Sequence, residues 1–415
     1  MKNSGQAEEY MKAKGKHIAM FSALNPGHVY PALGLCSELV RRGHRITYPT
    51  SDCFAEEIRQ TGAHPLVFRV PSLTNVEMIW QLPLVNNLRS WQLYASIFEP
   101  LRLSIIAATV AETEGFYRDN PPDLIVYDWD SFAGKIVGRM LNRPAVHVHA
   151  HFAQQGFLIR EDGVCMNPSP MLGFAHLLDS LLSAYGIEET GNLWHREDLN
   201  IIFVPREFQF DPASFDDRFH FVGPCLNRPT RSAWKNISHG KPVLLISESA
   251  FAKGDGAFLR ICIEAFADCE YHVVFSVGAN TQQIERCSVP KNFEINKDAY
   301  NLEVLPHAAA VVCHSGMGIV LESLHFGVPI VAIPNHAYNS EVAYRVAELG
   351  LGIHLRDCDV SSNSLRASVG ALMTDTVMRE RLKVMQKNVR NSGGAELAAD
   401  LLEGALRSTR SRFSV

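Results

Sequence analysis

The chain alternates short apolar runs with longer stretches whose apolar residues recur at helical spacing. The first run, residues 17–23, is followed by a helical pattern over 30–42 that ends in two arginines and a glycine, as helix C-termini often do. Further apolar runs follow at 44–50, 66–70, 123–129 and 145–150, with helical segments between most of them. This rhythm predicts parallel strands joined by helices that cover both faces of a sheet.

A second series of the same kind begins about a hundred residues later, with apolar runs at 243–249, 271–277, 310–315 and 329–334. At 415 residues the chain is longer than one compact core usually covers. We therefore predict an α/β protein with two doubly wound, Rossmann-like domains. The polar start and a proline-rich, weakly periodic stretch set the expected boundaries: a disordered leader at 1–16, an N-terminal domain at 17–227, a linker at 228–240, a C-terminal domain at 241–392 and a last helix at 393–415.

Composition narrows the class of protein. Hydrophobic residues make up 47% of the chain and charged residues 20%, which is typical of a soluble globular protein. The net charge of -5 argues against nucleic acid as a partner, because phosphate binding needs a concentrated basic surface. Nine cysteines without a C-x-x-C pair favour free thiols in a reducing, cytoplasmic environment. Without a run of roughly 20 apolar residues, we expect no stable membrane insertion.

Two segments depart from the alternating rhythm, residues 71–110 and 152–198. Both are rich in aromatic residues and methionine, including Trp80, Trp91 and Phe157. Such a composition suits a cleft for an apolar ligand, and packing as surface helices is an equally good interpretation for any single residue.

The first candidate for chemistry is His28, which follows Asn-Pro-Gly at the turn after the first strand. In an open α/β sheet ligands bind beyond the carboxyl ends of the strands, so this turn is a favoured position for a site. An unperturbed imidazole is a base near neutral pH. A histidine that only caps or packs at the helix start fits the same spacing.

Asp128 follows another strand of the same predicted sheet, so its carboxylate belongs at the same edge. A carboxylate bonded to one imidazole nitrogen fixes the tautomer and stabilises the imidazolium ion. We therefore predict a base-and-orienter pair of His28 and Asp128. Asp130 competes for the same role, and a lone aspartate after a strand also serves as a helix cap.

The second domain carries His314-Ser315-Gly316-Met317-Gly318 at a strand end, before a predicted helix. Glycines such as Gly316 and Gly318 let a backbone approach a ligand, and helix N-terminal amides attract anions, so this loop suits a diphosphate. Glu322 lies two turns into the helix, within reach of ribose hydroxyls.

Three histidines, His147, His149 and His151, alternate along one predicted strand. This spacing is compatible with a metal site, but we favour the wall of an acceptor cleft because no acidic ligand is adjacent.

Together these stretches resemble the antibiotic and macrolide glycosyltransferases of the two-domain GT-B fold, bacterial relatives of the UDP-glycosyltransferases. The resemblance covers almost the whole chain after the leader, and it is carried by residues 17–48, 123–146, 219–225 and 314–334. It implies two domains that face across a cleft, with the last helix returning to the N-terminal domain.

The resemblance also implies roles for single residues. It makes His28 the base that deprotonates an acceptor hydroxyl and Asp128 its support. It assigns His314 to the donor diphosphate and Glu322 to the ribose. It implies a UDP- or dTDP-sugar as co-substrate, with no metal required and a hydrophobic small molecule as acceptor.

The donor side departs from the family pattern. Where the family has glycine before a serine or threonine, this chain has Glu248 before Ser249. The tryptophan and glutamine that bind the nucleobase align with Asp298 and Asn301, and Ile319 replaces a small hydroxyl residue of the phosphate loop. The aspartate and glutamine that read the sugar fall on two neighbouring residues, Tyr338 and Asn339.

Three functions therefore follow from the sequence, in order of preference. The first is an inverting glycosyltransferase that moves a sugar from a nucleotide-diphosphate donor to a hydroxyl of a hydrophobic natural product. The second is an enzyme of this fold that has lost sugar transfer and uses the histidine and aspartate for acid/base chemistry on a natural-product intermediate. The third is a non-catalytic helper protein.

Overall fold

The computed structural model describes residues 15–68, 91–128, 131–153, 178–187, 197–226, 234–248, 256–277, 288–296, 301–335 and 337–412. Within these residues the chain forms two compact units, divided after Pro229 and before Ser392. The first division lies inside the linker predicted over 228–240, and the residues from Ser392 onward belong with the N-terminal unit. Tested over the described residues, no helix is long and apolar enough to cross a membrane.

The first unit is built on a parallel sheet, seven-stranded in the described residues, with the order β3-β2-β1-β4-β5-β6-β7. Its strands are β1 (His17–Phe21), β2 (Arg45–Thr50), β3 (His64–Val67), β4 (Leu124–Asp128), β5 (Ala145–His149), β6 (Asn200–Ile202) and β7 (Phe219–Phe221). Its helices include α2 (Pro26–Arg41), α3 (Ala55–Gln60), α6 (Trp91–Asp119), α7 (Ala133–Met140) and α15 (Gly394–Arg412).

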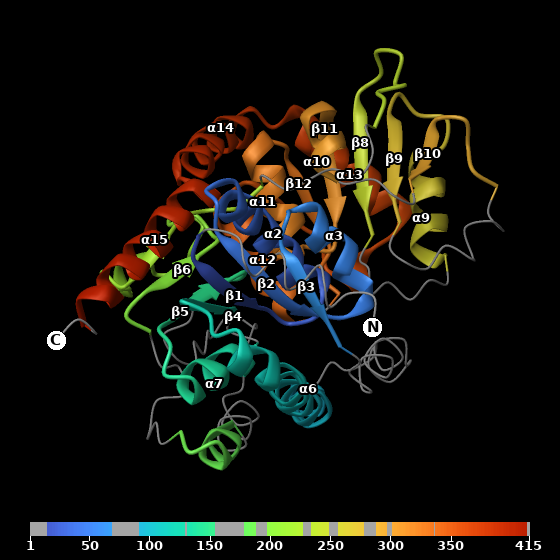
Figure 1. Ribbon diagram of the computed structural model, residues 1–415. Helices are drawn as coiled ribbons and strands as arrows, with labels where there is room; N and C mark the ends of the chain where they lie inside the picture. Colours follow the sequence, from blue (N-terminus) through green and yellow to red (C-terminus); the bar gives the residue numbers. More distant parts are fainter. Residues whose placement is uncertain are drawn as a thin grey trace. The chain divides into compact units, whose positions relative to one another are not determined.

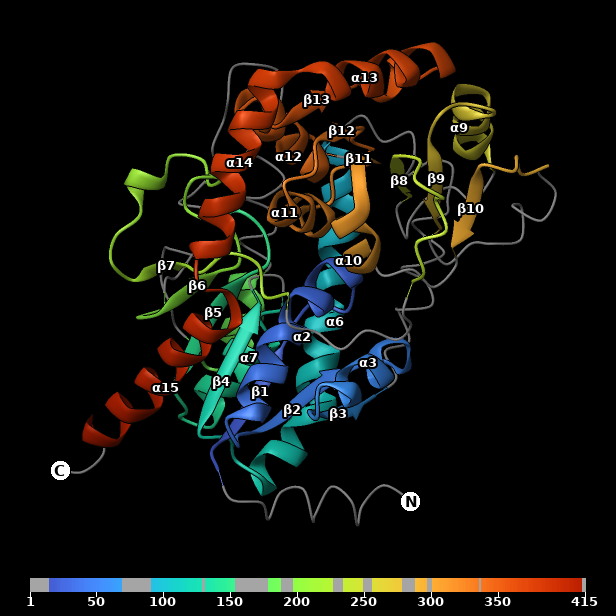
Figure 2. The ribbon, with the colours of Figure 1, turned by 90° about the horizontal axis from the view of Figure 1, so that it is seen from above.

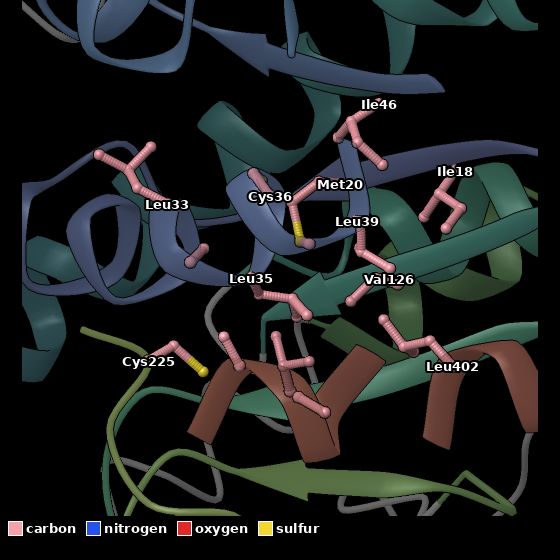
Figure 3. Packing of buried hydrophobic residues seen from close by; sticks show 14 of the residues in the cluster. Ile18, Met20, Leu33, Leu35, Cys36, Leu39, Ile46, Val126, Cys225 and Leu402 are labelled. Carbon is pink, nitrogen blue, oxygen red and sulfur yellow. The ribbon is translucent and has the colours of Figure 1, made fainter. Parts of the chain in front are cut away.

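Helices cover both faces of this sheet (Figure 1). Successive side chains of a strand point to opposite faces, so Met20 and Val126 contribute to one apolar core and their neighbours Phe21 and Tyr127 to the other. The first core lies under α2 and α15, and the second lies under α6 and α7. Figure 3 shows part of the first core, where residues of α2 and α15 meet those of β1, β2 and β4.

The last helix, α15, packs on α2 although it follows the second unit in the sequence (Figure 2). Leu402 is fully buried between them. At its start the Gly394 N–H donates to the Val222 carbonyl over 2.7 Å. At the end of α2 the Arg42 guanidinium donates to an Asp400 carboxylate oxygen over 2.6 Å. Apolar packing and this ion pair together stabilise the helix on the first unit.

The second unit has a parallel sheet with six strands in its described residues, ordered β10-β9-β8-β11-β12-β13. The strands are β8 (Val243–Ser247), β9 (His272–Ser276), β10 (Phe293–Asn296), β11 (Ala308–Cys313), β12 (Ile330–Ala332) and β13 (Gly352–His354). The helices include α9 (Ala257–Phe266), α10 (Asn301–Val304), α11 (Met317–Phe326), α12 (Ala337–Glu348), α13 (Ser362–Thr374) and α14 (Thr376–Asn391).

Two doubly wound parallel sheets confirm the predicted fold class. Each sheet reverses its strand order once, between β1 and β4 in the first and between β8 and β11 in the second. Such a reversal leaves a crevice beyond the carboxyl ends of the two strands, which is where open α/β sheets bind ligands. The topology therefore gives each unit one candidate position for a ligand-binding site.

Candidate active site

The candidate base, His28, lies in the first turn of α2. The helix begins at Pro26, after Asn25 in an extended N-cap conformation. Proline is favoured at this position because the first amides of a helix have no acceptor within it. The prediction that the helical stretch begins at residue 30 was therefore wrong by four residues. The early start makes His28 part of a rigid turn, with 16% of its side chain exposed.

Asp128 is the last residue of β4, and its side chain is only 2% exposed. Its Oδ2 lies 2.8 Å from Nδ1 of His28. His28 follows β1 and Asp128 ends β4, the two strands that flank the reversal of the first sheet, so the topology brings them together across 100 positions of sequence. The competing aspartate, Asp130, lies outside the described residues.

This pairing has a definite chemical consequence. A neutral imidazole whose Nδ1–H donates to a carboxylate has its lone pair on Nε2, which is then the basic nitrogen. The ionised Asp128 also stabilises the imidazolium ion formed after proton uptake. The pair is thus arranged to take a proton from a hydroxyl group.

The histidines of β5 lie on the other face of the sheet. The rings of His147 and His149 are 4.2 Å apart, and His147 stacks on Tyr127 at 4.8 Å. Burial lowers the pKa of His149 to about 4, and burial together with the charges of His149 and Lys135 lowers the pKa of His147 well below its usual value. Both rings are therefore uncharged at neutral pH in the folded protein. In the described part of the chain, no three potential ligands are grouped to hold a metal ion.

In the second unit the predicted phosphate loop lies at the carboxyl edge of the sheet, between β11 and α11. His314 and Ser315 follow β11, and Gly316 is the N-cap of α11. Ser315 has a φ of 62° and is buried, a backbone shape that turns the chain sharply from strand into helix. A Cβ atom at Gly318 would meet no atom within 4 Å, whereas one at Gly316 would lie 3.8 Å from Nε2 of His314.

Two other predicted donor residues are buried in the same unit. Glu322 lies in α11, and Asn339, in α12, donates from Nδ2 to Asn335 Oδ1 over 3.0 Å. Ser249 lies outside the described residues, as do Asp298 and several residues of the two aromatic-rich segments: Trp80, Phe157, Met166, Met171 and Trp194.

Glu248 follows β8 at the reversal of the second sheet, and its N–H donates to the Ser276 carbonyl over 3.0 Å. Burial and then the charge of Glu248 raise the pKa of Cys262 in α9 well above its usual value. The carboxylate is therefore within electrostatic reach of α9. Beside it, Asn301 donates from Nδ2 to Ser247 Oγ over 3.3 Å.

Sequence reasoning missed the hydroxyl groups at both edges, Ser22 with Tyr48 in the first unit and Ser247 in the second. Ser22 Oγ and Tyr48 OH are 2.7 Å apart and buried. A serine after a strand and a tyrosine inside one carry no distinctive spacing, so only the register of the sheet reveals such contacts.

Comparison with known proteins agrees with this architecture. The model for the erythromycin biosynthesis protein CIII-like C-terminal domain matches residues 260–403. The NDP-glycosyltransferase YjiC of Bacillus licheniformis is 34% identical over 397 residues, which cover 94% of this chain and 98% of that protein. The chain belongs to the antibiotic and macrolide glycosyltransferase family.

Other members of this glycosyltransferase family are similar to this chain over nearly its full length. Demethyllactenocin mycarosyltransferase of Streptomyces fradiae is 27% identical over 94% of this chain and 86% of its own. The crystal structure of the calicheamicin glycosyltransferase CalG4 is 33% identical, with a TM-score of 0.80 over 97% of this chain and 100% of that chain. The resemblance stated from the sequence is confirmed, and the protein is a glycosyltransferase with the two-domain GT-B fold.

Proposed function

We propose that this glycosyltransferase moves a sugar from a UDP- or dTDP-sugar to a hydroxyl group of a hydrophobic small molecule, with inversion at the anomeric carbon. The observation that carries the proposal is the 2.8 Å contact between His28 Nδ1 and Asp128 Oδ2 at the reversal of the first sheet. Relatives named for the glycosylation of antibiotics support the class of acceptor.

In the proposed reaction, Nε2 of His28 takes the proton of the acceptor hydroxyl as its oxygen bonds to the anomeric carbon. The bond from that carbon to the diphosphate oxygen breaks, and its electron pair leaves with the diphosphate. A single displacement of this kind inverts the carbon. Asp128 stabilises the imidazolium ion, and no metal ion is needed for any of these steps.

The second unit would hold the donor. The first amides of α11 would receive the diphosphate, because a helix N-terminus favours anions, and the family resemblance assigns the side chain of His314 to the same group. Glu322 would bind the ribose, and Asn339 the sugar. Glu248 is tolerable near a diphosphate only if its carboxylate points away from it or is protonated.

Calorimetry with UDP, dTDP and their glucose conjugates tests the donor half of the proposal. Binding of at least one in the micromolar range is expected, and no binding by any of them would refute it. The glucose conjugate of the nucleotide that binds is then incubated with a panel of phenolic and macrocyclic alcohols, and mass spectrometry shows whether the sugar is transferred. Proton NMR of the glycoside shows whether the anomeric configuration is inverted.

A further inference from the structure

Helix α14 carries a concentration of basic residues in a chain that is acidic overall. The helix contains a single acidic residue, Glu380, and five basic ones: Arg379, Arg381, Lys383, Lys387 and Arg390. Its formal charge is therefore +4, in a chain whose net charge is -5. A charge of this sign gathered on one helix makes the helix a candidate surface for an anionic partner.

One side of α14 is fixed to the second unit, and the other side faces solvent. The helix packs on α11 (Figure 2), and its buried residues are Met378, Leu382, Met385 and Val389. They recur at three- and four-residue spacing, so they occupy one stripe of the helix. All five basic residues lie outside that stripe and are exposed. The apolar stripe therefore holds the helix in place while the charges are presented outward.

Two valines interrupt this polar surface. Val377 and Val384 are 61% and 62% exposed, the highest values for large apolar residues in the described part of the chain. They are seven positions apart, about two turns, so they lie on the same side of the helix. Arg381 lies four residues after Val377 and three before Val384, so it neighbours both, and Lys387 lies three residues after Val384. The outward face thus combines an apolar pair with positive charge on both sides of it.

The two cations beside the valines keep their charge for an external partner. Neither Arg381 nor Lys387 has an ion-pair partner among the described residues. The one acidic residue of the helix, Glu380, is paired with Lys383, whose Nζ lies 2.6 Å from its Oε1. Arg390 donates to a backbone carbonyl of α11 over 2.9 Å, a contact that leaves its positive charge uncompensated.

We propose that this face of α14, Val377 with Val384 and the basic residues around them, docks on the surface of an anionic lipid membrane. Such a membrane attracts Lys and Arg, and aliphatic side chains between them reach the boundary of the acyl chains. A flat, deformable lipid surface accommodates one convex helix, whereas a stable protein interface needs about 800 Å² of complementary surface on each partner. The docking is peripheral, and none of the described helices spans a membrane.

Docking at this face goes beyond the proposed function and is compatible with it. The exposed side of α14 is turned away from the stripe that packs on α11, so docking leaves α11 uncovered. A hydrophobic acceptor partitions into lipid, and an enzyme held at the lipid surface would meet it at a higher local concentration.

The test is co-sedimentation of the full chain with lipid vesicles. Vesicles of phosphatidylcholine are compared with vesicles of phosphatidylcholine and phosphatidylglycerol. The chain should bind the anionic vesicles far better than the neutral ones, and raising the salt from about 0.05 M to about 0.3 M should weaken that binding at least tenfold. Equal binding to both kinds of vesicle overturns the proposal. So does binding to immobilised poly-L-glutamate without binding to anionic vesicles, a result that would identify an acidic protein as the partner.

Substitutions on the outward face separate its two components. Arg381→Glu with Lys387→Glu should weaken binding to the anionic vesicles by at least about tenfold, because each Lys or Arg near such a surface strengthens binding about fivefold. Val377→Ser with Val384→Ser should weaken it about threefold at both salt concentrations, since apolar contact is not screened by salt. Unchanged binding in both double variants overturns the proposal.

Arg59→Glu with Arg118→Glu is the matched control. These arginines of α3 and α6 are 49% and 56% exposed, and their reversal changes the net charge by the same amount. The control should bind anionic vesicles as the wild type does. An equal loss of binding in the control and in the α14 charge reversal would show that net charge alone decides binding, which refutes docking through α14.

Discussion

Two buried histidines of the first unit, His17 and His149, should make its stability depend on pH. Burial lowers the pKa of each to about 4 in the folded protein, with the charge of Arg45 also acting on His17. In an unfolded chain an imidazole titrates near ~6.5. The folded pKa is the lower one, so as the pH falls below about 6.5 the unfolded chain takes up protons that the folded unit excludes. The stability contributed by these neutral histidines is fully present above about pH 6.5. It is lost progressively as the pH falls from there to about 4.

The size of the effect follows from these two values. At pH 5 an unfolded histidine is almost fully protonated and a folded one is nearly neutral. Proton linkage then costs about 2 kcal/mol of unfolding free energy for each histidine. The two residues lie at different places in the sheet, so their contributions should add to about 4 kcal/mol. A loss of that size is a large part of the stability of an ordinary domain.

Hydrogen exchange of the amides of β1, β4 and β5 measures the first unit alone, once the intrinsic pH dependence of exchange is removed. The free energy of opening should fall by at least about 4 kcal/mol between pH 7 and pH 5, because the buried His147 adds to the loss from His17 and His149. His149→Phe keeps a ring against His147 and should recover about 2 kcal/mol of that loss. Equal pH dependence in the variant and the wild type would refute the reasoning.

Three further predictions follow from the contacts described. His28→Ala should reduce the rate of sugar transfer by roughly 10²–10⁴-fold and Asp128→Asn by less, in single-turnover assays of folded protein; an unchanged rate in His28→Ala would exclude it as the base. Leu402→Ala should lower the free energy of unfolding by about 2–5 kcal/mol in urea titrations, because Leu402 is fully buried between α15 and α2. Leu397→Ala, with a side chain 38% exposed on the same helix, should change it by about 0.5 kcal/mol or less, and equal losses would argue against the docking of α15. Glu248→Gly should tighten nucleotide-diphosphate binding about fivefold in calorimetry by removing repulsion, and weaker binding would contradict this.

Most of the sheet framework could be predicted from the sequence because its strands are buried on both faces. Runs such as those that became β1, β4, β8 and β11 are nearly continuous in apolar residues, and parallel strands need that pattern. The structure adds β6, β7, β10 and β13, which were not predicted. Each has only three or four residues, too few for a recognisable period.

The candidate site likewise has contacts that the sequence predicts and contacts that only the structure reveals. The contact of His28 with Asp128 could be predicted because His28 follows one strand and Asp128 ends another, and strand ends of a parallel sheet meet at one edge. The hydroxyl contact of Ser22 with Tyr48 was not foreseen, because it depends on register between strands, which no local pattern encodes. The early start of α2 was missed since a proline reads as a break, although it is favoured in a first turn.

Both units place a helix N-terminus at the carboxyl edge of a sheet beside its strand reversal, α2 in the first and α11 in the second. The partial positive charge there favours an anion by about 0.3–1 kcal/mol. In the first unit the anion is the protein's own, Asp128, and the same field opposes a proton on His28 while Asp128 favours it. In the second unit the segment from His314 to Gly318, which leads into the first turn of α11, supplies no carboxylate of its own. If the proposed function holds, the anion at the N-terminus of α11 is the diphosphate, which gains negative charge as it leaves the sugar. The same structural arrangement would then serve proton removal in the first unit and departure of the leaving group in the second.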